Sequence, residues 1–497
     1  MDLKFNKKPL RCMRPFFSKV HTQEQTQEIR LPDAYPDIGR VIGCWGQVLM
    51  RGKEWHSSFM GATGGVMAWI MYAPEDGTPP RILDVWMPIQ CRWDFPETVD
   101  DGVMILRPIL SALDGRSVSA RKMMIRASVD TFAQALGKDT LHIAEPAQMP
   151  EDVQLLKRTY PVDLPMEAGE KQVQLEEILS VPGNMPPIHK FMHYHMSPMI
   201  TEQKVLGNRL VFRGLSKIDM SYLTEDGSVQ NWKTEIPFSQ YVELDGDYSP
   251  SADAWVMPMV TAMELDMTDD QQLLMRGGIA AQYTVFDRNM IDVVEDAFSP
   301  KRDVTPQVEQ IRIPGMLDRD EVEIAIEGTS EMDRILQSIP MTQYPKLDFD
   351  ANGMRIRLNG QFQSLGMDAE GQLTGDTVRF DGSTAFTSAT ENQSHLWIGD
   401  ADTVDILPVS NGQMLRTTYP VTVQAYSGES IPMVTELELG EERLADPNRP
   451  SLILRRAGEE GLWAIAKASG STVSAIRDAN QLEDEPEIGQ MLLIPIS

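Results

Sequence analysis

The sequence has few cysteines. Only Cys12, Cys44 and Cys91 occur in 497 residues, and all three lie near the N-terminal end. A small, odd number of cysteines does not build a disulfide framework, and disulfides belong mainly to oxidising compartments. We therefore expect three free thiols in a protein that stays in a reducing compartment.

Long apolar runs are also lacking. No stretch approaches the roughly 18 to 20 apolar residues that would span a bilayer. The opening stretch MDLKFNKKPLRCMRPFFSKV is basic, but the apolar segment of about 7 to 15 residues that makes a secretory signal does not follow it. The sequence therefore predicts a cytoplasmic location, with neither membrane insertion nor a signal peptide.

Basic charge is scarce, with 45 Lys and Arg against 73 Asp and Glu, so the formal net charge is −28. Nucleic acids and anionic membranes favour clustered Lys and Arg, so the acidity argues against both as partners. Catalytic signatures are also missing: turns such as RGGIAAQ lack the strand-to-helix context of a phosphate loop. We expect no enzyme and no cofactor.

The most informative feature that is present is a repeat at an offset of 150 residues. The stretch GVMAWIMYAPEDG at 65–77 aligns with LSKIDMSYLTEDG at 215–227. The aligned pairs are Gly64 with Gly214, Tyr72 with Tyr222, and Gly77 with Gly227. A weaker third copy at 354–371 places Gly360 at the position of Gly214. Ordered matches at one offset indicate tandem structural units, and the chain length suggests about three or four domains.

The repeat has the pattern of β-strands. In the third copy Met354, Ile356 and Leu358 alternate with Arg355 and Arg357, which is the period of a half-buried strand. The EDG and AEG stretches indicate turns between strands. The fold class is therefore mainly β, with three tandem antiparallel β-sandwich-like units. The predicted boundaries are 1–150, 151–312, a divergent unit at 313–445, and a different module at 446–497.

The C-terminal module has helical periodicity between two short strands. SLILRR and MLLIPIS are the strand candidates, and the apolar positions between them recur at helical spacing. The stretch SGST interrupts that spacing, so one helix should end near Gly470 and a second should be capped by Ser471 or Thr472. The expected order is strand, helix, helix, strand.

This module resembles LysM domains. The matching residues are Trp463, Ile465, Ala466, Val473, Ile476 and Asn480 within LWAIAKASGSTVSAIRDAN, followed by Gly489, Gln490, Leu492, Ile494 and Pro495. The family usually has Gly-Asp-Thr before the Leu-Trp pair, as one wall of a glycan groove, where this chain has Glu459, Glu460 and Gly461. The Thr hydroxyl is replaced and a second carboxylate is added. We expect a retained fold that has lost glycan binding.

The whole chain resembles SipL-type spore-coat morphogenesis proteins, in which repeated β modules precede one LysM domain. The blocks TEIPFSQYVEL at 234–244 and LPDAYPDIGRVIGCWGQV at 31–48 carry this resemblance. It implies a protein of the mother cell at the forespore surface, whose LysM domain binds the ATPase of the coat's basement layer rather than glycan. The alternatives are a protein that binds the N-acetylglucosamine glycan of peptidoglycan and, third, an enzyme with an unrecognised site.

Two sets of residues are candidate sites. The groove of the LysM-like module is predicted to include Glu459, Glu460, Gly461, Leu462, Trp463, Glu487, Ile488 and Gly489. Within this set Leu462, together with Ile465, should face the core, whereas Trp463 could pack inward or line the helix surface. The second set is the histidines of HKFMHYHM.

These histidines, His189, His193 and His195, could hold a divalent metal if two of them share a helix or strand face. Neither a carboxylate nor a cysteine stands close by in the sequence, so we expect surface or packing histidines and no metal site.

Overall fold

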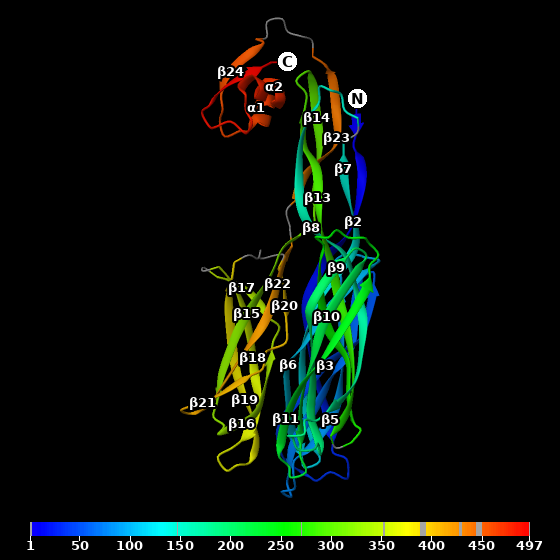
Figure 1. Ribbon diagram of the computed structural model, residues 1–497, viewed down its shortest axis with the longest axis vertical. Coiled ribbons are helices and arrows are strands. Elements are labelled where there is room, and N and C mark those ends of the chain that lie inside the picture. Colours follow the sequence, from blue (N-terminus) through cyan, green and yellow to red (C-terminus); the bar gives the residue numbers. More distant parts are fainter. Residues whose placement is uncertain are drawn as a thin grey trace.

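The computed structural model describes residues 2–146, 148–269, 271–350, 353–387, 394–426, 430–443 and 450–496. Three elongated β bodies lie side by side, a narrower β neck extends from one end of them, and a small helical module lies beside the neck (Figure 1). The predicted fold class is confirmed, because nearly all regular structure is antiparallel strand and the helices lie in the C-terminal module. Within the described residues, no helix combines the length and the apolar character needed to cross a bilayer.

The first unit is a sandwich of two three-stranded sheets. Its strands are β2 (Asn6–Arg30), β3 (Ile38–His56), β4 (Phe59–Pro74), β5 (Arg81–Asp94), β6 (Gly102–Ser119) and β7 (Lys122–Glu145). One sheet has the order β3-β4-β5 and the other β2-β7-β6. Buried residues such as Val66 and Leu83 on the first sheet share one core with Met104 and Ile125 on the second.

The second unit repeats this topology. Its strands are β8 (Gln154–Ser180), β9 (Lys190–Leu206), β10 (Arg209–Leu223), β11 (Val229–Glu243), β12 (Asp253–Met267) and β13 (Gln272–Phe298). The sheet β9-β10-β11 and the strands β8-β13-β12 correspond, one for one, to the two sheets of the first unit.

The third unit has the same plan with two interrupted strands. Its strands are β15 (Met316–Ser330), β16 (Arg334–Thr342), β17 (Lys346–Asp350), β18 (Gly353–Met367), β19 (Leu373–Phe386), β20 (Ser394–Ile398), β21 (Asp405–Val409) and β22 (Gly412–Tyr426). Strands β16 and β17 both pair with one edge of β18, and β20 and β21 both pair with β22. The predicted divergence of this unit therefore appears as broken edge strands.

The aligned glycines occupy one structural position. Gly64, Gly214 and Gly360 each lie on the central strand of the first sheet of their unit. At all three, a β-carbon would collide with a carbonyl oxygen of the preceding strand, that of Leu49, Met199 or Met341. A glycine in a strand commonly marks such a close backbone approach, so the repeat seen in the sequence is a repeat of the fold.

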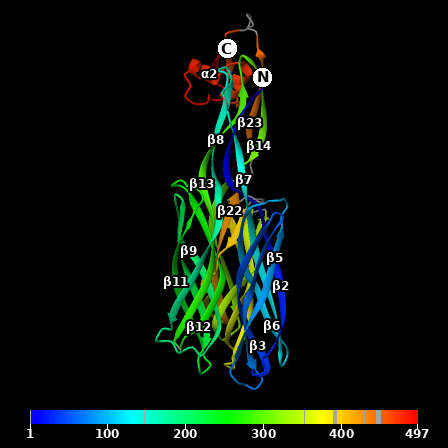
Figure 2. The same ribbon diagram turned by 90° about the vertical axis from the view of Figure 1, so that its right-hand side faces the viewer.

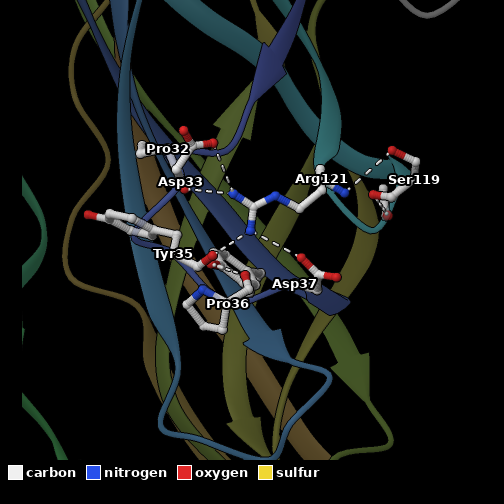
Figure 3. A network of polar contacts seen from close by, with 9 residues as sticks. Pro32, Asp33, Tyr35, Pro36, Asp37, Ser119 and Arg121 are labelled. Atoms are coloured by element: carbon white, nitrogen blue, oxygen red, sulfur yellow. Dashed lines mark hydrogen bonds and ion pairs between the residues drawn. The ribbon is translucent and has the colours of Figure 1, made fainter.

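In each of the first two units, an equivalent tyrosine anchors the loop between the first two long strands, β2 and β3 or β8 and β9. The hydroxyl of Tyr72 donates to the carbonyl of Pro36, and that of Tyr222 donates to the carbonyl of Pro186, at 3.0 Å and 2.9 Å. In the first unit, Arg121 adds further bonds to this loop (Figure 3). Its guanidinium donates to the carbonyl oxygens of Pro32 and Tyr35 and to the carboxylate of Asp37.

The sequence did not predict the neck. Strand pairs β2/β7 and β8/β13 continue beyond their sandwiches, and β14 (Arg302–Arg312) pairs with β23 (Ser430–Glu442) as a third ribbon (Figure 2). The short β1 (Asp2–Lys4) also pairs with β23. The three ribbons share one buried core, which includes Leu141, Ile143, Ile291, Val293, Met433 and Leu437.

The domain boundaries at 150, 312 and 445 stay a prediction. The strand pairing supports one adjustment: β14 pairs with β23, so residues 302–312 group with the ribbon of the third unit rather than with the second unit. A division at about 300 would keep each ribbon with its own sandwich.

Two glutamine side chains connect the first and second units, because each amide forms a pair of hydrogen bonds with the backbone of one residue in the other unit. The Gln47 amide bonds both the N–H and the carbonyl of Met196, and the Gln282 amide does the same to Leu106. Beside them, the ammonium of Lys53 pairs with the Glu170 carboxylate at 2.5 Å. Burial lowers the pKa of Lys53. Each of these two amides has both its donor and its acceptor satisfied by the other unit, which favours one fixed arrangement of the units.

The three cysteines are free and buried, as the sequence predicts. Burial raises the pKa of the Cys12 thiol to about 11 and also raises the pKa values of Cys44 and Cys91. Because the thiolate is the reactive form, these groups are inert packing residues rather than nucleophiles.

Candidate functional site

The C-terminal module has the predicted order of elements, β24 (Leu452–Arg456), α1 (Leu462–Ser469), α2 (Val473–Asn480) and β25 (Met491–Pro495). The first helix ends at Gly470, whose φ of 64° is left-handed and suits glycine. The second begins after Thr472, whose hydroxyl accepts from the backbone N–H of Ala475 at 3.1 Å. The fully buried core of the C-terminal module consists of Leu462, Ile465, Ala466, Ile476, Leu492 and Ile494.

The predicted groove residues form two neighbouring loops. Glu459, Glu460 and Gly461 lie between β24 and α1, and Glu487, Ile488 and Gly489 lie between α2 and β25, all exposed. The loops meet where the N–H of Gly489 donates to the carbonyl of Ala457 at 2.8 Å. Of the predicted set, only Leu462 is buried, as expected for a core residue. The assignment of this rim to partner binding stays a prediction.

The side chain of Glu485 reaches from the second loop to the first, a contact that no sequence pattern predicted. Its carboxylate accepts a hydrogen bond from the backbone N–H of Leu462 at 2.7 Å. A β-carbon on Gly461 would lie 3.2 Å from the same carboxylate oxygen. Glu460 is engaged separately, because it pairs with Arg455 at 2.6 Å. The first turn of α1 is therefore already occupied by an acidic side chain.

Trp463 faces outward from α1 and contacts the second unit. Its indole N–H donates to Asp296 at 2.8 Å, and the ammonium of Lys467 bonds both oxygens of the same carboxylate at 2.8 Å and 2.7 Å. The rings of Trp463 and Phe298 meet edge to face, with centroids 4.7 Å apart. Of the two alternatives for Trp463, the surface position is the one observed, and Lys467, Asp296 and Phe298 were not predicted.

The candidate metal histidines do not converge. His189 is exposed, whereas the buried His193 ring stacks on Trp45 with centroids 5.1 Å apart. The Nε2 of His193 lies 2.8 Å from Oε1 of Gln337, so this nitrogen donates. Burial lowers the pKa of His193 to about 4 and also lowers the pKa of His195. The described residues contain no group of three or more His, Cys, Asp or Glu side chains placed to hold a metal ion.

Excess zinc is therefore expected to leave the melting temperature of the protein unchanged. A site occupied at 100 times its dissociation constant would add about 2.7 kcal/mol to the free energy of unfolding. Differential scanning fluorimetry with and without zinc measures the effect. An upward shift that disappears in His193→Ala would contradict the packing role of this histidine.

His193 and His195 line a cavity of about 860 Å³ where the three units meet. Ion pairs cross or border this cavity: Arg107 pairs with Asp400 at 2.6 Å, and Lys233 pairs with Asp219 at 2.9 Å. Arg107 belongs to the first unit and Asp400 to the third, so this pair ties the units together. These four of the charged residues that line the cavity are thus engaged with one another.

Comparisons with known families agree with this architecture. Residues 187–268 match the model of the SipL, SPOCS domain, and residues 459–495 match that of the LysM domain. The first match spans β9 to β12 of the second unit. Neither a search of curated proteins nor a search of solved structures found a match. Both matched families are non-catalytic binding domains; SPOCS points to sporulation, and LysM is a peptidoglycan-binding type.

Proposed function

We propose that this chain, a SipL-type protein with a C-terminal LysM domain, is a non-enzymatic scaffold of spore-coat morphogenesis. It works in the mother-cell cytoplasm at the forespore surface. Its LysM domain binds a protein of the coat's basement layer, an ATPase-type morphogenesis protein. The three β units hold that domain at the end of a long rigid body.

The observation that carries the proposal is the acidic, internally bonded rim of the LysM domain. Gly461 offers no side-chain donor, and the neighbouring N–H of Leu462 is taken by Glu485. A neutral acetamido sugar would have to displace that carboxylate, which has an existing charge-assisted bond. A protein that presents Lys or Arg would instead pair with the exposed carboxylates of Glu459 and Glu487, and such complementarity sets specificity and association rate.

Reversing charge at the rim is expected to weaken binding of the coat protein. The double change Glu459→Lys and Glu460→Lys should lower affinity for the purified coat ATPase about tenfold at low salt, and less at high salt because exposed charges are screened. The fold should survive, because the ion pair of Glu460 with Arg455 is surface-exposed and contributes little. Biolayer interferometry at several salt concentrations measures the loss.

A control is Glu225→Lys, which reverses one exposed charge on a turn of the second unit, against the two reversed at the rim. It changes net charge without touching the LysM domain, so its affinity should equal that of the parent. Equal weakening by Glu225→Lys would show that the effect comes from overall charge. In that case the rim would not be the binding surface.

The second candidate is a tether to peptidoglycan, which the LysM match itself favours. It requires that the parent protein sediments with purified peptidoglycan. Glu460→Asp with Gly461→Thr should then strengthen sedimentation, and Glu485→Ala should be added because a side chain at 461 would crowd the carboxylate of Glu485. Parent protein that sediments with peptidoglycan and ignores the coat ATPase at every salt concentration would decide for the tether.

A further inference from the structure

One surface of the LysM domain is already occupied by another part of the chain. The Asp296 carboxylate lies between the indole N–H of Trp463 and the ammonium of Lys467, which are one helical turn apart on α1. Phe298 follows two residues later and packs on the Trp463 ring. A carboxylate, a cation, an indole donor and an aromatic pair thus meet in one small interface. This combination is typical of protein recognition rather than of chance contact.

Strand β13, which supplies these groups, has two features that bring them to the LysM domain, a register shift and an extension at its end. The pairing of β13 with β8 shifts register between Val294 and Asp296, and such a bulge re-aims the side chains that follow it. Strand β7 of the first unit ends at Glu145, which the 150-residue offset places opposite Glu295. Only past that point does β13 add Asp296 to Phe298. Phe298 is 4% exposed and belongs to the hydrophobic cluster of the LysM domain, not to that of the neck.

We propose that the α1 surface formed by Trp463 and Lys467 is a protein-recognition site, which the end of β13 occupies within the same chain. The external partner presents the same chemistry, a carboxylate two residues ahead of an aromatic ring on an extended strand, and binds by displacing Asp296 and Phe298. This rests on the proposed function for the partner's identity, but not for the existence of the site. Because the partner binds only molecules in which Asp296 and Phe298 have left the α1 surface, its apparent affinity is the intrinsic affinity multiplied by the fraction of such molecules.

The contact itself is tested first, in the full-length protein without a partner. Hydroxyl-radical footprinting read by mass spectrometry reports the solvent access of Trp463 and Phe298 separately. Asp296→Ala should raise the oxidation rate of both rings several-fold. The control Asp292→Ala, on the same strand but bonded to Thr159, should not. Equal rates in the parent and in Asp296→Ala would overturn the proposal, because the contact would not be held by Asp296 in solution.

The chemistry of recognition is tested with a synthetic peptide of residues 291–300, IDVVEDAFSP. Added at millimolar concentration to the Asp296→Ala protein, it should restore the protection of Trp463. The same peptide with asparagine in place of the aspartate nearest its C-terminal end, the equivalent of Asp296, should not. Failure of the first peptide to protect, or equal protection by both, would overturn the proposed recognition of a carboxylate.

The link to function is tested with the purified coat ATPase. Asp296→Ala should raise its affinity about tenfold, which corresponds to about 1.4 kcal/mol, whereas Asp292→Ala should leave affinity at the parent value. Adding Lys467→Glu to Asp296→Ala should abolish the gain. If the ATPase binds but ignores both changes, it does not use the α1 surface and the displacement is wrong. If no variant binds it while the peptide is recognised, the proposed function fails and the recognition site stands.

Discussion

Ile465→Ala is expected to unfold the LysM domain while the β units stay folded. Ile465 is 0% exposed in a core of few side chains. Truncation of a buried isoleucine costs roughly 2–5 kcal/mol, because contacts are lost and a cavity remains. A domain of this size has a total stability of only about 3–5 kcal/mol. Brief trypsin digestion of the full-length protein, read by mass spectrometry at Lys467 and Arg477, should show rapid cleavage.

Ile488→Ala is the matched control, since it removes the same atoms from the same domain at a residue that is 74% exposed. It should resist trypsin as well as the parent does. Comparable cleavage of the two variants would mean that the domain is not held by the core described above. The comparison also shows why core variants cannot test binding: an unfolded domain binds nothing, whichever surface is used.

Acidification from pH 6.5 to pH 4 is expected to lower the free energy of unfolding by about 3 kcal/mol through His193 alone. Burial lowers the pKa of His193 from 6.5 to about 4 in the folded protein. Below pH 6.5 the His193 ring is therefore protonated in the unfolded chain, whereas in the folded protein it stays neutral down to about pH 4. The contribution of the neutral ring to the free energy of unfolding is fully present above pH 6.5. It is lost as the pH falls through this window, at about 1.4 kcal/mol per unit of the pKa difference.

Urea unfolding followed at several pH values measures this loss. His193→Gln keeps a donor for Gln337 and cannot titrate, so its unfolding free energy should fall by about 3 kcal/mol less over the same window. The remaining fall should reflect His395 and His195, whose pKa values burial also lowers. Identical pH profiles for the parent and His193→Gln would show that this ring is not buried in solution.

Local patterns determined much of this protein before any contact was known. Alternation in residues 354–362 predicted a strand, because side chains on neighbouring positions of a strand face opposite sides. The offset of 150 residues predicted tandem units, and the glycines at 64, 214 and 360 prove to be places where two backbones approach closely. The helices of the LysM domain were predicted from a break near Gly470 and a cap at Ser471 or Thr472, of which Thr472 is the one observed, and both signals act within a few residues.

The contacts between distant segments needed the tertiary structure. The sequence by itself determined the β units, their repetition, the free cysteines and the order of the LysM elements, since each depends on neighbouring residues or on comparison of one segment with another. Only the tertiary structure decided that three ribbons share a neck, that Glu485 occupies the first turn of α1, that His193 lies between Trp45 and Gln337, and that Asp296 holds Trp463. The last pair is separated by 167 residues. A register shift in β13 between Val294 and Asp296 lies directly at this contact. Which side chain a bulge turns toward which neighbour depends on how whole units pack rather than on the residues near it.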